Sequence, residues 1–318
     1  MLLAFTLFGC APSYPKAEFK ESIIKLCKDE YNIDVKVETV GKTIAIYLPL
    51  SNLIDFTFAI TKEASEKIGN VILSVSRVAL STDAKYDFYC IIAHDVRIPD
   101  IQIVIIKSID DVKRFFLGDI SRNEYTKRML IDIRMTPQAQ KEKSIREVLD
   151  KMVVDKKAQE QFLSEFFRNE PAGLNEIGYW NGKFYIKDVT LPEFLADQVA
   201  SRIRIAFKED KKLAESFLVK SSKGSYSSQP PRSIFRFEIF ATATKVVVGT
   251  KGESNIDDIL EESLKVASAV IHGYRFKDYE YIDIINQANG GFMRVSQADA
   301  EKFYSKKIKF SELKKKVY

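Results

Sequence analysis

The chain has 318 residues, of which 46% are hydrophobic and 29% are charged. This is the composition of an ordinary globular protein, and the length allows two domains. The net charge of +5 is mild for this length, and no stretch approaches the roughly twenty apolar residues of a membrane-spanning helix. Disorder is expected only near Ser221–Arg232.

The first ten residues form an apolar run that ends in Leu7-Phe8-Gly9-Cys10, and polar, proline-containing sequence follows directly. This pattern resembles the lipobox of bacterial lipoproteins. The resemblance implies that Cys10 carries lipid and that residues 1–10 are the remnant of a signal whose basic segment is encoded upstream. A diacylglyceryl group supplies two acyl chains, which anchor a protein stably to a membrane. The alternative is a short, uncleaved apolar N-terminus.

The resemblance also implies a location at the bacterial cell envelope, facing the periplasm or the outside, where nucleic acid is not an expected partner. Ala11 rather than Asp follows Cys10, which by resemblance to lipoproteins of two-membrane bacteria permits export to the outer membrane. The remaining cysteines are Cys27 and Cys90. An oxidising compartment would allow them to pair, but two separate buried thiols are the favoured interpretation.

Residues 16–130 are predicted to form the first of two α+β domains. Helical spacing of apolar residues predicts helices, alternation predicts strands, and Pro49 is expected to end one strand. Ser108 is expected to cap a closing helix, with Asp110 and Asp111 in its first turn. The elements predicted before that helix are a helix, two strands, a helix and two strands over Lys16–Glu30, Asp34–Val40, Thr43–Leu48, Phe58–Leu80, Tyr86–His94 and Gln102–Lys107.

Residues 131–190 are predicted to be a linker of different character. Ser144–Phe167 has the pattern of a charged amphipathic helix or helix pair, and Gly178–Ile186 that of a hairpin around Asn181-Gly182. This hairpin displays Tyr179 and Trp180, together with Phe184 and Tyr185. Such rings are favoured at interfaces, so the hairpin is expected either to bind a sugar or a partner, or to pack between the two domains.

Residues 191–318 are predicted to form the second α+β domain. Its last two strands flank the favourable turn dipeptide Asn289-Gly290. Ser221–Arg232 is expected to be a polar excursion. The predicted elements are a helix, two strands, a helix, two strands and a helix over Glu193–Phe207, Ser233–Phe240, Thr244–Gly249, Ile256–Gly273, Asp278–Ile285, Phe292–Val295 and Gln297–Tyr304.

The two predicted domains are related by a local repeat. When Ser108–Arg128 is set over Ser296–Lys316, serine, aspartate and phenylalanine residues coincide at a constant spacing. The clearest matches are Ser108 with Ser296, Asp111 with Asp299 and Phe115 with Phe303. The sequence therefore predicts an internal duplication of an α-β-β-α-β-β-α domain, with antiparallel sheets covered by helices on one face.

Catalytic motifs are absent from the sequence. It contains no glycine-rich phosphate loop, no C-x-x-C, no H-E-x-x-H and no G-x-S-x-G. No catalytic, cofactor-binding or metal-binding residue is therefore predicted. His94-Asp95 is the best acid-base pair, but neighbours on a strand point to opposite faces, so His94 is interpreted as a surface residue at a strand end.

Structural roles account for the other candidate residues. His272 is interpreted as the end of a helix capped by Gly273. Asp110-Asp111 and Asp257-Asp258 are interpreted as acidic residues at helix starts. The lysines between Lys306 and Lys316 are interpreted as a solvated helix face, with anionic lipid headgroups or nucleic acid as the alternative contact.

The predicted function is a non-enzymatic binding, scaffolding or assembly role at the cell envelope, on a protein held to the membrane through Cys10. A protein partner in the envelope is expected, and no small-molecule ligand is assigned. One alternative is an envelope hydrolase that uses carboxylates or His94. Another is a cytosolic two-domain adaptor with an uncleaved N-terminus.

Overall fold

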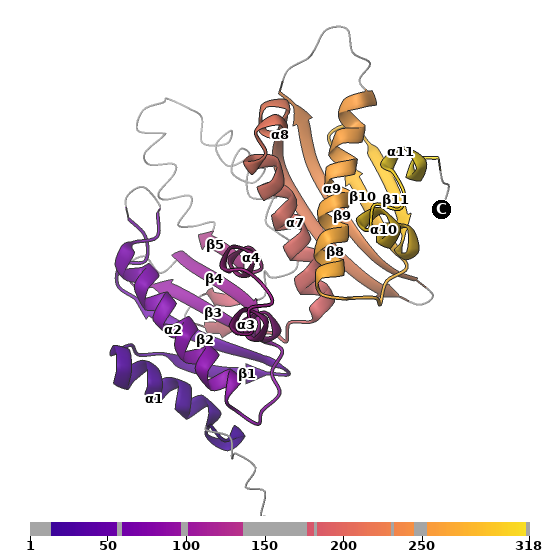
Figure 1. Cartoon of the computed structure of the whole chain (residues 1–318). Helices are drawn as coiled ribbons and strands as arrows, with labels where there is room; N and C mark the ends of the chain where they lie inside the picture. Colours follow the sequence, from indigo (N-terminus) through magenta and orange to yellow (C-terminus); the bar gives the residue numbers. More distant parts are fainter. Residues whose placement is uncertain are drawn as a thin grey trace, which may run out of the picture. The chain divides into compact units, whose positions relative to one another are not determined.

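The computed structural model describes residues 14–55, 59–96, 101–135, 177–180, 183–229, 232–244 and 253–315. They fall into two compact units, the first formed by 14–135 with 177–188 and the second beginning at Val189 (Figure 1). Each unit contains a mixed β-sheet with packed helices, so the predicted α+β class is confirmed. The lipobox residues Leu7–Cys10 and the predicted helix over Ser144–Phe167 lie outside the described residues.

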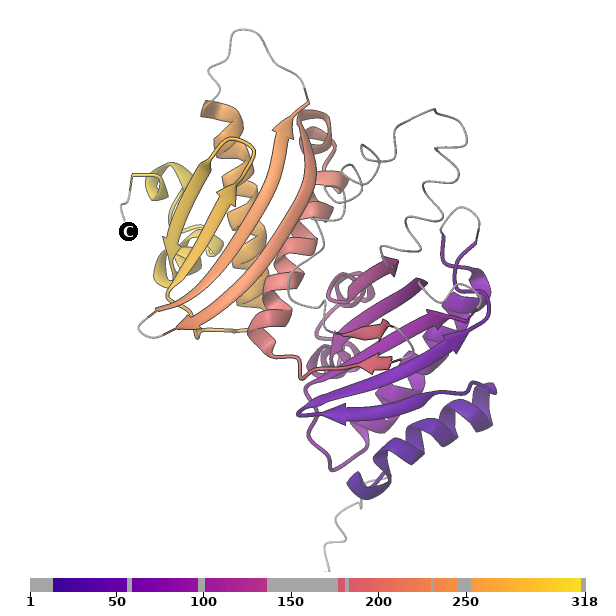
Figure 2. The ribbon, with the colours of Figure 1, turned by 180° about the vertical axis from the view of Figure 1, so that it is seen from behind.

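The first unit has a five-stranded sheet in the order β1-β2-β3-β4-β5 and a two-stranded sheet, β6-β7. Helices α1 to α4 cover one face of the large sheet, and the β6-β7 hairpin lies on the other face (Figures 1 and 2). The elements are η1 (Lys16–Glu18), α1 (Phe19–Tyr31), β1 (Lys36–Val40), β2 (Thr43–Leu50), α2 (Lys62–Leu80), β3 (Phe88–Asp95), β4 (Ile101–Ser108), α3 (Ile109–Phe116), α4 (Arg122–Lys127), β5 (Leu130–Met135), β6 (Gly178–Trp180) and β7 (Lys183–Tyr185).

The core of the first unit lies between its large sheet and helices α1 and α2. Side chains of alternate residues along β2, β3 and β4 point to this layer. Helix α2 contributes apolar residues at helical spacing, as predicted. Its buried apolar residues are Ala64, Ile68, Val71, Val75 and Val78.

The predicted antiparallel arrangement is wrong for one strand pair in each unit. Strand β2 pairs with β3 in parallel, and β9 pairs with β10 in parallel. In each case a long helix connects the two strands and returns the chain to the end of the sheet where the first strand began. Parallel neighbours need such a crossover, whereas hairpins give only antiparallel pairs.

Two predicted boundaries in the first unit are also wrong. Pro49 lies within β2 instead of ending it, because β1 pairs with β2 only as far as Tyr47. The carbonyl of Leu50 accepts from Val96 on the β3 side, so the nitrogen of Pro49 faces the side where β1 has already ended.

Helix α2 begins at Lys62 after the cap Thr61, while Ile60, expected inside the helix, forms an isolated bridge with Ile54.

The second unit has a four-stranded sheet in the order β11-β10-β9-β8. Helices α7, α9 and α10 lie on one face of it (Figures 1 and 2). The elements are α7 (Leu191–Glu209), α8 (Lys211–Ser216), β8 (Phe217–Gln229), β9 (Arg232–Ala243), α9 (Glu253–Gly273), β10 (Tyr281–Asn286), β11 (Gly291–Ser296), α10 (Gln297–Tyr304) and α11 (Phe310–Leu313).

The polar excursion predicted for Ser221–Arg232 is wrong, because most of this segment belongs to strand β8, which pairs with β9. Its small residues reflect close packing against α7. A Cβ placed on Gly224 would lie 2.0 Å from the carbonyl oxygen of Ala196 in α7, so no side chain fits there. Thr244, predicted to start the next strand, follows the end of β9, and residues 245–249 lie outside the described residues.

Parts of the segment predicted as a linker belong to the first unit. Strand β5 pairs with β4 along Ile101–Ile106. The backbone N–H of Tyr179 donates to Gln102 Oε1 over 2.7 Å, and Arg134 donates to the carbonyl of Ile177. Asp188 accepts from the Lys42 N–H and from the Thr43 hydroxyl, both at 2.9 Å. Residues 131–135 and 177–188 therefore complete the first unit.

Candidate functional site: a lysine-rimmed groove on the second unit

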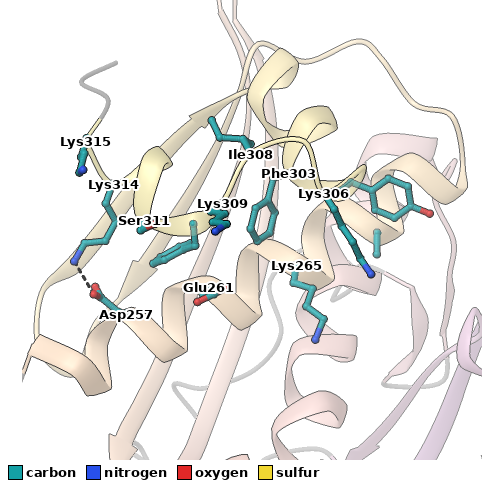
Figure 3. A pocket seen from close by; sticks show the side chains of 13 residues that line it. Asp257, Glu261, Lys265, Phe303, Lys306, Ile308, Lys309, Ser311, Lys314 and Lys315 are labelled. Atoms are coloured by element: carbon teal, nitrogen blue, oxygen red, sulfur yellow. Dashed lines mark hydrogen bonds and ion pairs between the residues drawn. The ribbon is translucent and has the colours of Figure 1, made fainter.

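The candidate site is a groove of about 1200 Å³ between α9 and the α10–α11 segment (Figure 3). Helix α10 follows β11 directly, and the Ser296 hydroxyl caps it by accepting from the Asp299 N–H. Lys306, two residues after the end of the helix, has a φ of 59°, which turns the chain toward α11. This short connection holds α10 and α11 side by side along α9.

Apolar side chains from α10, α11 and the turn between them line the groove. Phe303 and Phe310 have ring centroids 6.5 Å apart, and Phe310 is buried while Ile308 is half-buried. Ala269 of α9 faces them and leaves room because its side chain is small. Figure 3 shows Phe303 pointing toward α9. The groove therefore offers an apolar lining to a bound group.

Lysines dominate the rim of the groove. Lys314 pairs with Asp257 of α9 over 2.6 Å and Lys265 pairs with Glu262 over 3.1 Å. For the exposed Lys306, Lys309 and Lys315, no ion pair is found among the residues that the structure describes. The sequence placed Asp257-Asp258 at a helix start, but α9 begins at Glu253, so the structural role of Asp257 is its ion pair with Lys314. An anionic group would meet three uncompensated ammonium groups here.

Glu261 is the second carboxylate that lines the groove. Partial burial raises its pKa, and repulsion by Asp258 and Glu262 raises it further, while the charge of Lys265 lowers it. The acidic side chains on α9 are thus crowded together. Their crowding favours cations beside them, and Lys314 and Lys265 supply these through their ion pairs with Asp257 and Glu262.

A second hollow of about 600 Å³ lies on the other flank of α10. Tyr304 lines both hollows, and its ring lies 4.1 Å, between centroids, from that of His272. Positive charge is added to this hollow by Arg275, Lys277, Lys302 and Lys307.

The predicted C-terminal cap of α9 at Gly273 is wrong, because the left-handed conformation falls on Arg275, with a φ of 55°.

The first unit has a hollow of about 570 Å³ between α2 and the α3–α4 segment. Exposed Leu73 and Phe116 line it, together with buried Ser76 and half-buried Tyr125. Its lining is poorer in charge than the groove of the second unit, since Glu66 is its ionisable acid and it has no lysine. It is the weaker candidate for an anion-binding site.

A buried polar cluster lies close to Tyr125. Lys107 is fully buried, with Nζ 2.9 Å from the centroid of the Tyr125 ring, and its Nζ has no hydrogen-bond partner among the described residues. Burial lowers the pKa of Lys107 to about 7, against the charge of Asp111, which raises it. Asp111 itself accepts from Arg128 over 2.9 Å. The sequence placed Lys107 at a strand end and gave no sign of this burial.

His94 is not the surface residue that the sequence predicted. It is buried, its Nδ1 lies 3.2 Å from the hydroxyl of Tyr47, and its ring centroid is 4.5 Å from that of Tyr179. Burial and the neighbouring Tyr179 raise the pKa of Tyr47 to about 12. Asp95 points away, as expected, and accepts from the Leu53 N–H over 2.9 Å. The structure therefore does not join His94 and Asp95 into an acid-base pair.

The aromatic hairpin and the cysteines have structural positions. Tyr179 and Phe184 pack on Tyr47, with ring centroids 4.9 and 5.6 Å away, so these rings cover the large sheet of the first unit.

Cys27 and Cys90 are both free and buried, which confirms two separate thiols. Burial raises the pKa of Cys27, and that of Cys90 to about 12, so neither is a reactive thiolate at neutral pH.

No family model, curated protein or solved structure matches the chain. Within the described ranges, no group of three or more histidine, cysteine, aspartate or glutamate side chains is placed to hold a metal ion. None of the helices in those ranges combines the length and the hydrophobicity that crossing a bilayer requires.

Sequence reasoning missed the groove as a site. It identified the lysines but interpreted them as a solvated helix face. The available signal was the apolar set Phe303, Ile308 and Phe310, which is interspersed with the lysines from Lys302 to Lys315 and is too large for a fully solvated segment.

Proposed function

We propose that this protein is a lipid-anchored component of the bacterial cell envelope with a non-enzymatic binding role, and that the groove of the second unit is its binding site. The lysine-rimmed, apolar-lined groove carries the binding role, since ammonium groups over an apolar lining suit a ligand that is both anionic and partly apolar. The anchor rests on the resemblance of Leu7-Phe8-Gly9-Cys10 to a lipobox.

The hydrolase alternative finds less support. A histidine base needs a substrate within hydrogen-bond reach, whereas the His94 ring is enclosed by Tyr47 and Tyr179. Of the two carboxylates lining the groove, Asp257 is held by Lys314. The binding role therefore accounts for more of the observed geometry.

The internal duplication is part of the proposal, and the order of elements supports it. In each unit a hairpin is followed by a crossover helix and a second hairpin, with the parallel pair at the same step, and the first sheet adds β5. Helix α10 begins and ends 188 residues after α3, and α11 begins 188 residues after α4. This is the spacing at which the sequence repeat was found.

Backbone hydrogen bonds add support at the same spacing. The Leu117, Gly118 and Asp119 N–H groups donate to the carbonyls of Lys113, Phe115 and Arg114, which closes α3. The corresponding donors and acceptors, 188 residues later, close α10 in the same pattern. Gly118 and Lys306 share a positive φ, of 78° and 59°. The buried Asp111 and Asp299 also correspond.

The anchor is tested by metabolic labelling with a fatty acid, with the gene expressed from its native locus. The wild-type protein is expected to incorporate the label and to enter the detergent phase on phase separation, because two acyl chains dominate its partitioning. Cys10→Ser is expected to lose the label and to stay in the aqueous phase. Cys27→Ala is the matched control and should keep both properties.

Recovery of unlabelled wild-type protein in the aqueous phase would contradict the anchor. It would favour the third interpretation, a cytosolic adaptor with an uncleaved N-terminus.

A further inference from the structure

We infer that the second unit binds the surface of an anionic phospholipid membrane through the basic face around α10. The basic face consists of the cationic residues that line the two hollows flanking this helix, which are Lys265, Arg275, Lys277, Lys302, Lys306, Lys307, Lys309, Lys314 and Lys315. The inference rests on the proposed function in that it names the ligand class of the same groove.

Local charge favours an anionic partner. The segment 297–315 contains six lysines and three acidic residues. Asp299, one of the three, is buried and pairs with Lys302 over 3.8 Å. On the facing helix, Asp257 and Glu262 already pair with Lys314 and Lys265. The basic face therefore keeps a positive surplus beside the groove, and its potential extends over about a Debye length, roughly 8 Å at physiological ionic strength.

The type of cation favours mobile anionic headgroups over a fixed pattern of anionic groups. Eight of the nine cations of the basic face are lysines. Lysine is a flexible point charge, whereas arginine provides the rigid fork that pairs with carboxylates and phosphates in two-bond geometry. Flexible lysines on two flanks of one helix suit headgroups that move laterally, and they suit a fixed carboxylate pattern less well.

Apolar and aromatic residues lie among these lysines. Tyr304 is 43% exposed and lines both hollows. Half-buried Phe303 and Ile308 lie next to it in the groove. A tyrosine with an apolar ring and a polar tip is favoured at the level of the headgroups. The groove then receives the glycerol and upper acyl region beneath the phosphate.

The test measures co-sedimentation of full-length Cys10→Ser protein with vesicles, because this variant removes the covalent anchor. Vesicles of phosphatidylcholine with about 30% phosphatidylglycerol are compared with phosphatidylcholine alone, at about 0.1 M and about 0.5 M salt. We expect binding to the anionic vesicles only, with loss at the higher salt.

Two matched triple variants locate the contact. Replacement of Lys306, Lys309 and Lys315 by Gln removes the exposed, unpaired lysines of the groove and is expected to weaken vesicle binding at least about tenfold, since each lysine near an anionic surface contributes appreciably. Replacement of Lys208, Lys211 and Lys212 by Gln changes the net charge equally on α7 and α8, and is expected to leave binding unchanged. All six lysines are exposed, so both variants should keep the wild-type melting temperature.

Three results would overturn the inference. They are absence of binding to anionic vesicles, equal binding to neutral vesicles, and equal loss in the two triple variants. Binding of an acidic peptide by the groove without vesicle binding would assign the site to a protein partner instead. Fatty-acid labelling of Cys10 in the wild-type protein is unaffected by any of these results, so the anchor and the basic face are tested separately.

Discussion

A single buried lysine gives the first unit a pH-dependent stability. Lys107 is fully buried and has a pKa of about 7 in the folded protein, against 10.5 for an ordinary lysine. Between these two values the unfolded chain binds a proton that the folded chain does not, so this residue makes stability rise with pH, by about 1.4 kcal/mol per pH unit. Below pH 7 Lys107 is protonated in both the folded and the unfolded protein, and the destabilisation caused by burying its ammonium group is at its maximum.

Lys107→Met should therefore stabilise the protein most at pH 6 to 7 and progressively less as the pH rises toward 10, because the wild-type lysine loses its buried charge over that range. Urea unfolding of both proteins at several pH values measures the difference. Lys113→Met, which changes an exposed lysine on α3, is the control and should show no such trend. A constant difference between Lys107→Met and the wild type at all pH values would contradict the burial of a charge.

Lys306 is a further residue whose backbone is informative. It has a φ of 59° at the end of α10, in the conformation that glycine adopts without a steric cost. Lys306→Gly is expected to stabilise the second unit by up to about 1 kcal/mol. Lys307→Gly is the control, because Lys307 has no positive φ, and it should be neutral or slightly destabilising. Thermal unfolding measures both, and a lower melting temperature for Lys306→Gly would contradict the assignment.

Some residue-level features could be predicted from the sequence and others could not. The burial of Cys27 followed from helical periodicity, since its neighbours on the same stripe, Phe19 and Ile23, are apolar and also buried. The burial of Lys107 and His94 could not be predicted, because it depends on which segments cover the two faces of the sheet. Helices α3 and α4 cover Lys107, and the β6-β7 hairpin covers His94. Both covering segments come later in the chain than the residues they bury.

At the level of elements, the contact between α7 and β8 is the most restrictive feature of the second unit. Gly224 lies against the backbone of Ala196. Gly224→Ala is expected to destabilise the unit by about 2 to 3 kcal/mol, because the added methyl group must displace a helix backbone. Ser225→Ala, at the next and exposed position of the strand, is the control. Chemical denaturation measures both, and equal stability of the two variants would contradict the close packing.

The β8 segment also shows why elements were misassigned. Serine and glycine are poor strand formers by composition, so Ser221–Arg232 was predicted as a polar excursion. A helix packed close to this strand requires small residues in it. The local sequence pattern does not reveal that requirement. Conversely, a helix was predicted near Gln297–Tyr304, and α10 has these bounds.

For the whole molecule, the central strands of each sheet should be the most protected parts of each unit. In the first unit, β3 has partners on both sides and is buried along its whole length, whereas β1 is a five-residue edge strand with alternately exposed positions. Hydrogen–deuterium exchange is expected to be slowest in β3 and clearly faster in β1. Equal protection of the two strands would contradict the position of β1 at the sheet edge.

The order of elements in each unit could be largely predicted, but the sheet order could not. Sequence shows that a hairpin, a helix and a hairpin follow one another. It does not show that the helix returns the chain to give the parallel pairs β2-β3 and β9-β10. The groove depends on the same level of structure, since α10 and α11 form it only by packing along α9.

The position of Pro49 bears on self-association. Where β1 stops, the outer side of β2 would otherwise present a backbone donor to a strand of another molecule. Proline has no such donor, and its ring also obstructs a neighbouring chain. Among the residues that the structure describes, no strand pairs with this side of β2 beyond Tyr47, so the residue that was expected to end a strand instead withholds a backbone donor from a second protein molecule.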